Sequence, residues 1–176
     1  MRKIVLCALL LALSSSVLRS QELALSTNAV DYVGLGTLNA ELSYGVSRHW
    51  SVSAGVKYNP FTFSEGPDAV QNRQRSVRLG ARYWPWHIYS GWWMGCRAGY
   101  QKYNAGGVRS SDTTEGDRYG AGLSGGYSYM LAPHLNLDFG VGFWSGRDGY
   151  VTYACPTCGR ILEQGSRYFV LPDDII

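Results

Sequence analysis

The chain has 176 residues, the length of one domain. Its hydrophobic content of 45% and mean hydropathy of −0.14 exclude a bundle of membrane-spanning helices, since no internal apolar run approaches the roughly 18 residues that such a helix needs. Charged residues make up only 16%, against about 25% in soluble domains, while glycine (22 residues) and aromatic residues (14%) are abundant, as in transmembrane β-barrels.

The start of the chain has the features of a secretory signal peptide. Arg2 and Lys3 form a charged start, and an apolar run and small serines follow. We predict a signal peptide over residues 1–20, with cleavage after Ser16 as the alternative, and Cys7 is removed with it. Its loss leaves 13 of the 16 basic residues against 13 acidic ones, so the net charge of +3 is no argument for nucleic-acid binding.

The rest of the chain alternates between apolar and polar or small side chains. The alternation is strictest in residues 38–46 and 50–58, which a polar turn at residues 47–49 separates, and this predicts an antiparallel hairpin. Residues 167–176 are too short and irregular to predict a complete eighth strand. In chain order the predicted strands are residues 23–32, 38–46, 50–58, 75–84, 92–103, 118–129 and 135–144.

The predicted connections alternate in length. Short turns are expected at residues 47–49, 85–91 and 131–134, and longer polar loops at residues 60–74, 104–117 and 145–166. Outer-membrane barrels have short periplasmic turns and long external loops. The sequence therefore predicts an antiparallel up-and-down transmembrane β-barrel of about eight strands in residues 21–176, with the last strand short or incomplete.

The two faces of the predicted strands differ sharply, and two hypotheses assign them oppositely. A soluble periplasmic, lipocalin-like barrel binding an apolar ligand would bury Leu42, Val56 and Leu137, whereas a membrane barrel points them at lipid. Aromatic residues near the strand ends favour the membrane barrel because they suit interfacial girdles. These residues are Trp50, Tyr58, Tyr83, Trp84, Trp92, Tyr100, Tyr103, Tyr119 and Tyr129.

The polar face carries charged side chains that we predict to meet in the lumen. They are Glu41, Lys57, Arg78, Arg82, Arg97 and Asp138. An eight-stranded barrel is barely wide enough for its own side chains, so the long cations need glycine neighbours. A packed polar plug is the favoured interpretation, and a proton or ion path is the alternative.

Cys155 and Cys158 form the sharpest local motif, C-P-T-C. A redox site would need a βαβ context, and a zinc site would need four ligands. Export to an oxidising compartment favours a disulfide that stiffens an external loop. Metal binding and free thiols remain the alternatives.

Catalytic residues do not emerge from the sequence. His49, His87 and His134 fall in predicted short turns, where interfacial polar residues are favoured over a metal cluster. A lipid-modifying barrel enzyme would want a serine and a histidine near the external rim, and the sequence gives no such pair. We therefore expect no enzyme activity, no cofactor and no bound metal.

Several short segments together resemble one family. They are Leu25-Ser-Thr-Asn28, Trp50 with Tyr58-Asn-Pro-Phe-Thr-Phe63, Ala81-Arg-Tyr-Trp84, Gly99-Tyr100 with Tyr103-Asn104, Tyr119-Gly-Ala-Gly122 and Cys155-Pro-Thr-Cys-Gly159. Over residues 24–169 the chain is similar to small outer-membrane barrels of the Bacteroidetes type, the domain of unknown function 3575. The resemblance implies an outer-membrane β-barrel and no substrate. Expected partners are outer-membrane lipid, the barrel assembly machinery and a surface partner reached through the external loops.

Overall fold

The computed structural model describes residues 23–33, 36–62, 71–106, 112–155 and 159–173, and the predicted signal peptide lies outside this part of the chain. Strands account for most of the described residues. The elements in chain order are β1 (Leu23–Ser26), α2 (Ala29–Val33), β2 (Leu38–Gly45), β3 (Trp50–Asn59), β4 (Gln71–Tyr83), β5 (Gly91–Gly106), β6 (Thr113–Ala132), β7 (Leu135–Tyr153) and β8 (Ile161–Asp173).

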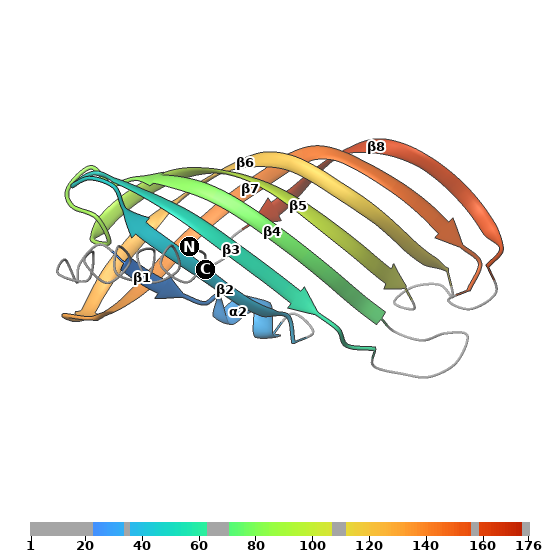
Figure 1. Ribbon diagram of the computed structural model, residues 1–176, viewed down its shortest axis with the longest axis horizontal. Helices are drawn as coiled ribbons and strands as arrows, with labels where there is room; N and C mark the ends of the chain where they lie inside the picture. Colours follow the sequence, from blue (N-terminus) through green and yellow to red (C-terminus); the bar gives the residue numbers. More distant parts are fainter. Residues whose placement is uncertain (1–22, 34–35, 63–70, 107–111, 156–158, 174–176) are drawn as a thin grey trace, which may run out of the picture.

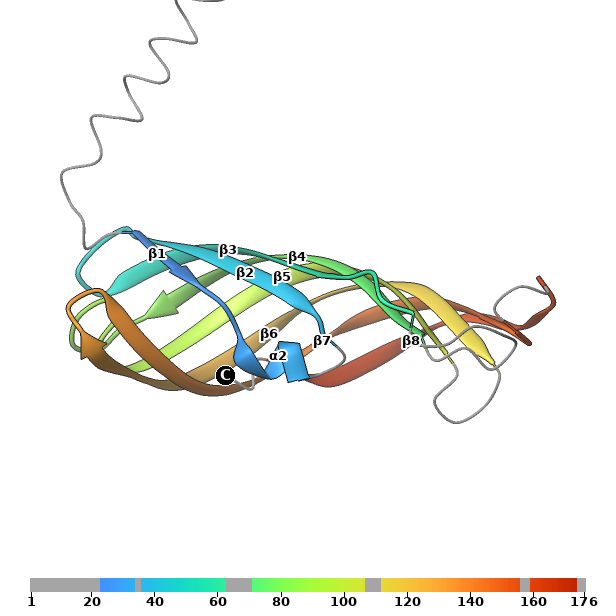
Figure 2. The same ribbon diagram turned by 90° about the horizontal axis from the view of Figure 1, so that it is seen from below.

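The strands form one eight-stranded antiparallel sheet in which each strand pairs with its neighbours in sequence. The sheet curls strongly, so it has a concave and a convex face (Figures 1 and 2). Within the described residues β1 and β8 are not paired with each other, and the curl stays open along one side. The predicted all-β, up-and-down fold of about eight strands is confirmed, whereas the described ladders do not close it into a barrel.

The two ends of the sheet differ in their connections. The turn end holds the short links at residues 46–49, 84–90 and 133–134. The loop end holds the links between β3 and β4, between β5 and β6, and between β7 and β8. We use the names turn end and loop end below.

Period-two alternation places polar side chains on the concave face and apolar ones on the convex face. Leu42, Val56 and Leu137 are 48%, 55% and 45% exposed on the convex face. Arg82 is only 7% exposed on the concave face. This arrangement is the reverse of the one that an apolar-ligand barrel of the lipocalin kind requires.

The convex face changes character along the strands. One row in register across β3 to β6 is apolar and aromatic: Val56, Val77, Tyr100 and Tyr119. Its next member, on β7, is the exposed Arg147. The row two residues nearer the loop end runs from Tyr58 into charged side chains: Arg75, Lys102 and Asp117. From Trp92 to Tyr100, β5 places an unbroken series of uncharged side chains on this face. The convex face is therefore an uncharged band with a charged border on its loop-end side.

The first predicted strand is wrong in its second half. β1 ends at Ser26, and α2, residues 29–33, takes the place of the last four residues of the predicted strand 23–32. The Asn28 side chain accepts a hydrogen bond from the backbone N–H of Val30 at 2.9 Å, which is the action of a helix N-cap. Asn39 fixes Asn28 in turn through hydrogen bonds to its backbone N–H and C=O. None of the helices in the described residues is long and apolar enough to span a membrane.

The later strands are longer than predicted. β6 and β7 have 20 and 19 residues, so much of the predicted loops 104–117 and 145–166 is strand. The polar, glycine-rich residues there pair across the sheet, with Gly106 opposite Thr113 and Tyr150 opposite Gly165. Ladder pairing overrides the low strand propensity of such residues.

The eighth strand is also longer than predicted. The sequence predicts a last strand that is short or incomplete. β8 has 13 residues and pairs with residues 142–153 of β7, so it is not short, but its described part does not cover the whole of β7. Its described part stops opposite Gly142, and residues 135–141 of β7 therefore have no partner on that side among the described strands. Pro172 sits near the end of β8, where a missing N–H is tolerated at the sheet edge.

Candidate functional site

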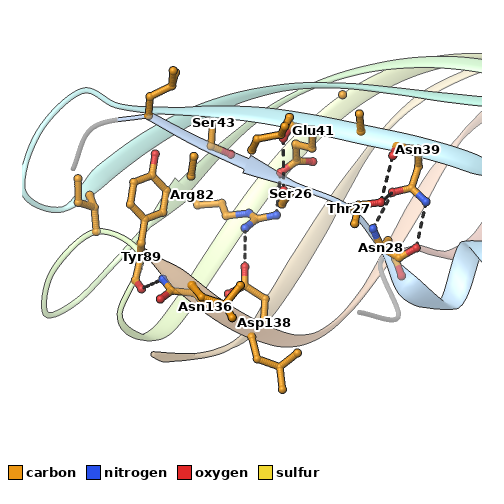
Figure 3. A pocket seen from close by; sticks show the side chains of 18 of the residues that line it. Ser26, Thr27, Asn28, Asn39, Glu41, Ser43, Arg82, Tyr89, Asn136 and Asp138 are labelled. Carbon is orange, nitrogen blue, oxygen red and sulfur yellow. Dashed lines mark hydrogen bonds and ion pairs between the residues drawn. The ribbon is translucent and has the colours of Figure 1, made fainter. Parts of the chain in front are cut away.

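The concave face of the turn-end half carries a cluster of four charged side chains, which we call the Arg82 cluster: Glu41, Arg82, Arg97 and Asp138. Arg82 Nη2 donates to Glu41 Oε1 at 2.8 Å, and Arg82 Nη1 donates to Asp138 Oδ2 at 3.3 Å. Arg97 Nη1 lies 3.9 Å from the second Glu41 oxygen. Strands β2, β4, β5 and β7 each supply one member, so the cluster crosses the inside of the curl (Figure 3).

Trp93 packs beside this cluster and fills the interior. The guanidinium of Arg82 lies 4.6 Å from the centre of the Trp93 ring, a cation–π geometry. The ring reaches the backbone at Gly126 and Gly140, where an added Cβ would lie 2.8 and 2.7 Å from Trp93 Cζ2. These two glycines therefore make room for the indole.

The other two predicted network residues also lie on the concave face, but they have different partners. Lys57 Nζ is 2.6 Å from Asp31 Oδ2, so Lys57 ties β3 to α2. The Arg78 guanidinium lies 5.6 Å from the centre of the Trp144 ring. Four of the six predicted residues are thus brought into one cluster, and α2 supplies a carboxylate that the sequence did not indicate.

The turn end is closed by the link between β4 and β5, residues 84–90. Trp84 is fully buried and Ile88 nearly so, and both pack on Trp93. Trp84 Nε1 donates to Ser51 Oγ at 3.0 Å, and the backbone oxygen of Tyr89 accepts from Asn136 Nδ2 at 2.6 Å. This link therefore contacts both β3 and β7 and covers the interior at the turn end. We call residues 84–90 the turn-end cap.

A cavity of about 890 Å³ lies between the Arg82 cluster and the open side of the sheet. Its walls include Glu41, Arg82 and Asp138 on the inside, and β1 and residues 135–139 of β7 at its mouth. Figure 3 shows Ser26 and Thr27 on one side of this space and Asn136 and Asp138 on the other. We call its mouth, between β1 and residues 135–141 of β7, the side opening.

A second charged cluster, the Asp148 cluster, lies toward the loop end: Tyr103, Arg118, Asp148 and Arg167. Asp148 is fully buried, and its Oδ2 lies 3.3 Å from Arg118 Nε and accepts from Arg167 Nε at 3.0 Å. Tyr103 donates to the same carboxylate at 2.9 Å. Burial, followed by this hydrogen bond, raises the pKa of Tyr103.

Sequence reasoning missed the Asp148 cluster because residues 145–166 were assigned to a loop. The apolar–polar alternation of β7 breaks at Trp144, and Ser145 and Arg147 on the convex face are polar, so the sequence carries no alternation signal for Asp148. Trp144 and Phe169 pack edge to face beside it, with ring centres 4.6 Å apart. Paired charges and stacked rings therefore fill the interior where β8 is present.

Most of the aromatic residues predicted for interfacial girdles lie on the convex face, but two do not. Trp84 is fully buried in the turn-end cap, and Tyr103 is buried in the Asp148 cluster. Both were predicted from their position near strand ends, without regard to which face they occupy. Tyr103 falls on the concave face because it keeps the same parity as Trp93 and Arg97 on β5.

The histidines and cysteines do not form a cluster in the described part of the chain. His49 Nδ1 lies 2.9 Å from the Trp84 carbonyl oxygen, while His87 and His134 line the cavity. No group of three His, Cys, Asp or Glu side chains suited to a metal is found among the described residues. Cys96 is a free cysteine exposed on the convex face. Cys158 lies outside the described residues, so the Cys155–Cys158 disulfide stays a prediction.

A family profile described as "Protein of unknown function (DUF3575)" matches residues 4–175. The chain belongs to the DUF3575 family. This confirms the family to which the sequence motifs point. No curated protein and no solved structure matches the chain.

In this DUF3575 chain, the groups inside the curled sheet that could interact with a ligand are the charged side chains of the two clusters. The Arg82 cluster offers guanidinium donors and carboxylate acceptors to the cavity. The Asp148 cluster satisfies its carboxylate internally and leaves it no contact with solvent. The Arg82 cluster borders a cavity of about 890 Å³, the size of a small-molecule site, whereas Arg118 of the Asp148 cluster borders a smaller one of about 250 Å³.

Proposed function

We propose that the chain is a non-enzymatic outer-membrane β-barrel protein with a plugged polar lumen, whose loop-end surface serves contacts outside the cell or envelope structure. Export by a cleaved signal peptide and insertion by the barrel assembly machinery belong to this proposal. The observation that carries it is the convex face, on which large apolar side chains are exposed over every strand. Soluble monomers rarely expose an apolar patch beyond a few hundred Å².

The height of the convex uncharged band supports a membrane location. The band on β5, from Trp92 to Tyr100, is comparable with the about 9–11 residues that a tilted strand needs to cross a bilayer. Aromatic residues stand at both of its edges, as in interfacial girdles. Trp50 and Tyr83 pack together at the turn end, with ring centres 5.1 Å apart. The charged row Arg75, Lys102 and Asp117 then marks the loop-end interface with water.

The interior supports a plug rather than a conducting path. The turn-end cap, Trp93 and the two charged clusters occupy the cross-section at successive heights. The charges inside are paired with one another, as the Arg82 and Asp148 clusters show. Such fixed pairs suit structural filling of a small barrel.

The loop-end part of the sheet supports a role in contacts outside the membrane. Strands β5, β6 and β7 have 16, 20 and 19 residues, so they continue beyond the uncharged band. Their exposed tyrosines are held by carboxylates: Tyr150 donates to Glu163, and Tyr153 donates to Glu115. A disulfide between Cys155 and Cys158 would stiffen the tip beyond β7. We therefore propose that a rigid strand extension, more than long loops, forms the contact surface.

Cysteine labelling in isolated outer membranes tests the membrane location. Cys96 lies on the convex face, so a lipid-phase maleimide is expected to label it and a membrane-impermeant one is not. In a Cys96→Ser background, Leu79→Cys on the convex face should behave like Cys96. Thr152→Cys, beyond the band, is the matched control and should react with the impermeant reagent. Equal labelling of Leu79→Cys and Thr152→Cys by the impermeant reagent would contradict the proposal.

Two further measurements test the barrel and the plug. Unheated protein should migrate differently from boiled protein in gel electrophoresis, as folded barrels do, and should need detergent to leave the membrane fraction. In planar bilayers the wild-type protein should give no steady conductance. A steady ion current would support the proton or ion path in place of the plug.

A further inference from the structure

We infer that the cavity behind the side opening is a binding site for an anionic lipid, with the headgroup beside the Arg82 cluster and the acyl chain leaving through the side opening. This inference rests on the proposed membrane location, because the acyl chain must then lie in the bilayer. The cavity volume of about 890 Å³ falls in the range of small-molecule sites, roughly 300–1,000 Å³.

The side opening exists because two strand edges face it without partners among the described strands. β1 pairs with β2 through Leu23–Ser26, and its other edge has no described partner. On the other side, β8 reaches only to Gly142, so residues 135–141 of β7 have a bare edge. Residues of both edges line the same cavity. The described strands therefore leave the cavity open on this side.

The chemistry of the walls matches an amphiphile. Deep in the cavity lie Lys57, Arg78, Arg82 and Arg97. Lys57 pairs with Asp31, and Arg82 and Arg97 pair with Glu41 and Asp138, so these side chains have one more cation than carboxylates. At the mouth, Leu25, Leu137 and Phe139 line the cavity and are exposed on the convex face. A cationic interior with an apolar mouth fits an anionic headgroup attached to a hydrocarbon chain.

The depth of the cavity distinguishes a lipid from an added strand. A peptide paired with the free edges of β1 or β7 would lie in the plane of the sheet. The cavity instead continues inward to Gly55 and Arg97, which lie on the far wall of the curl. A strand in the side opening would leave this inner space unfilled, whereas a headgroup occupies it.

Ala24 allows the site to be closed with a small change. It lies on β1 opposite Ser43, a buried concave residue, and it lines the cavity. A phenylalanine in its place would project into the cavity. Ala98 is the matched control, because it is exposed on the convex face of β5 and tolerates an apolar ring.

The test is native mass spectrometry of the purified full chain in a neutral maltoside detergent. The probes are palmitoyl lysophosphatidylglycerol, palmitoyl lysophosphatidylcholine and glycerol 3-phosphate. We expect one lysophosphatidylglycerol to bind per chain, at least about tenfold more tightly than lysophosphatidylcholine. Both lipids carry the phosphate, but the choline cation cancels the net negative charge and offers no hydrogen-bond donor. Glycerol 3-phosphate without the chain should not be retained. Ala24→Phe should lose at least about tenfold in affinity, and Ala98→Phe should match wild type.

A second variant tests the headgroup contact. Arg82→Gln should reduce the preference for lysophosphatidylglycerol over lysophosphatidylcholine, and heat-modifiable mobility checks that the variant still folds. Equal binding of both lipids, or full binding by Ala24→Phe, would overturn the inference. If glycerol 3-phosphate alone is retained, the cavity is a site for a free phosphate compound and not for a lipid, which would also overturn the inference. The membrane-labelling experiment is independent, so a chain that is membrane-embedded but binds no lipid refutes this site and leaves the proposed function standing.

Discussion

The two charged clusters inside the curled sheet are near mirror images in charge, and they differ in the size of the space beside them. The Arg82 cluster centres a cation between two carboxylates and borders a large cavity. The Asp148 cluster centres a carboxylate between two arginines, and that carboxylate is fully buried. The two clusters differ because of the extent of β8. Its described part pairs with residues 142–153 of β7 and leaves residues 135–141 without a partner on that side. The same kind of ion pairing thus seals one half of the interior and lines a ligand-sized space in the other.

The largest effect should come from removing the centre of the sealed cluster. Asp148→Ala removes a fully buried carboxylate that pairs with Arg118 and with the half-exposed Arg167, and we expect a loss of about 2–3 kcal/mol in the free energy of unfolding. Urea unfolding in detergent micelles, followed by tryptophan fluorescence, measures it. Asp117→Ala is the control, because its ion pair with Lys102 is exposed and should contribute less than about 1 kcal/mol.

Asp138→Ala tests whether the open cluster is easier to break. Asp138 accepts from Arg82 and Ser128, but water in the cavity can replace it. We expect a loss of about 1–2 kcal/mol in the free energy of unfolding, clearly below that of Asp148→Ala. Equal losses for the two variants in the same urea titration would remove the contrast between a sealed and an open half.

Gly140→Val tests how the turn-end half is filled. The added Cβ would lie 2.7 Å from Trp93 Cζ2, so the indole must move, at an expected cost of about 1–3 kcal/mol. Thermal unfolding by circular dichroism measures the change. Gly149→Val is the matched control, because a Cβ added at Gly149 would meet nothing within 4 Å. In a Trp93→Leu background the cost of Gly140→Val should fall, and an unchanged cost would show that the indole is not the obstacle.

The smallest expected effect is on the strand extension beyond the uncharged band. The hydrogen bond from Tyr153 to Glu115 at 3.1 Å raises the pKa of Tyr153. A raised pKa favours the protonated phenol in the folded state, so this stabilisation is present below about pH 10 and is lost as the pH rises through the folded-state pKa. Glu115→Gln should lower the pKa of Tyr153 in an NMR titration of labelled tyrosine. An unchanged pKa would mean that the hydrogen bond does not form.

The sequence predicted the sheet, its order and its two faces because strict alternation sets them. Leu38 to Gly45 and Trp50 to Asn59 carry that alternation without interruption, and their observed bounds lie within a residue or so of the prediction. The Arg82 cluster could be anticipated for the same reason, since Glu41, Arg82, Arg97 and Asp138 all fall on the polar face of predicted strands.

The parts that could not be predicted depend on pairing across the sheet. The residues after Trp144 are polar and glycine-rich, and only the ladder with β8 makes them a strand, so Asp148 was assigned to a loop. Asp31 was missed because helix α2 forms where Asn28 caps it and Asn39 holds Asn28 in place. In both cases the prediction used the local propensity of the residues, whereas a contact with a distant part of the chain determines their structure.

The strand order has a consequence for how the chain folds and moves. Every ladder joins neighbours in sequence, so the contacts are local for an all-β protein and none requires the two ends of the sheet to find each other. The seam between β1 and β7 carries no described backbone ladder. It can therefore widen or narrow by bending of the sheet while every interstrand hydrogen bond stays intact.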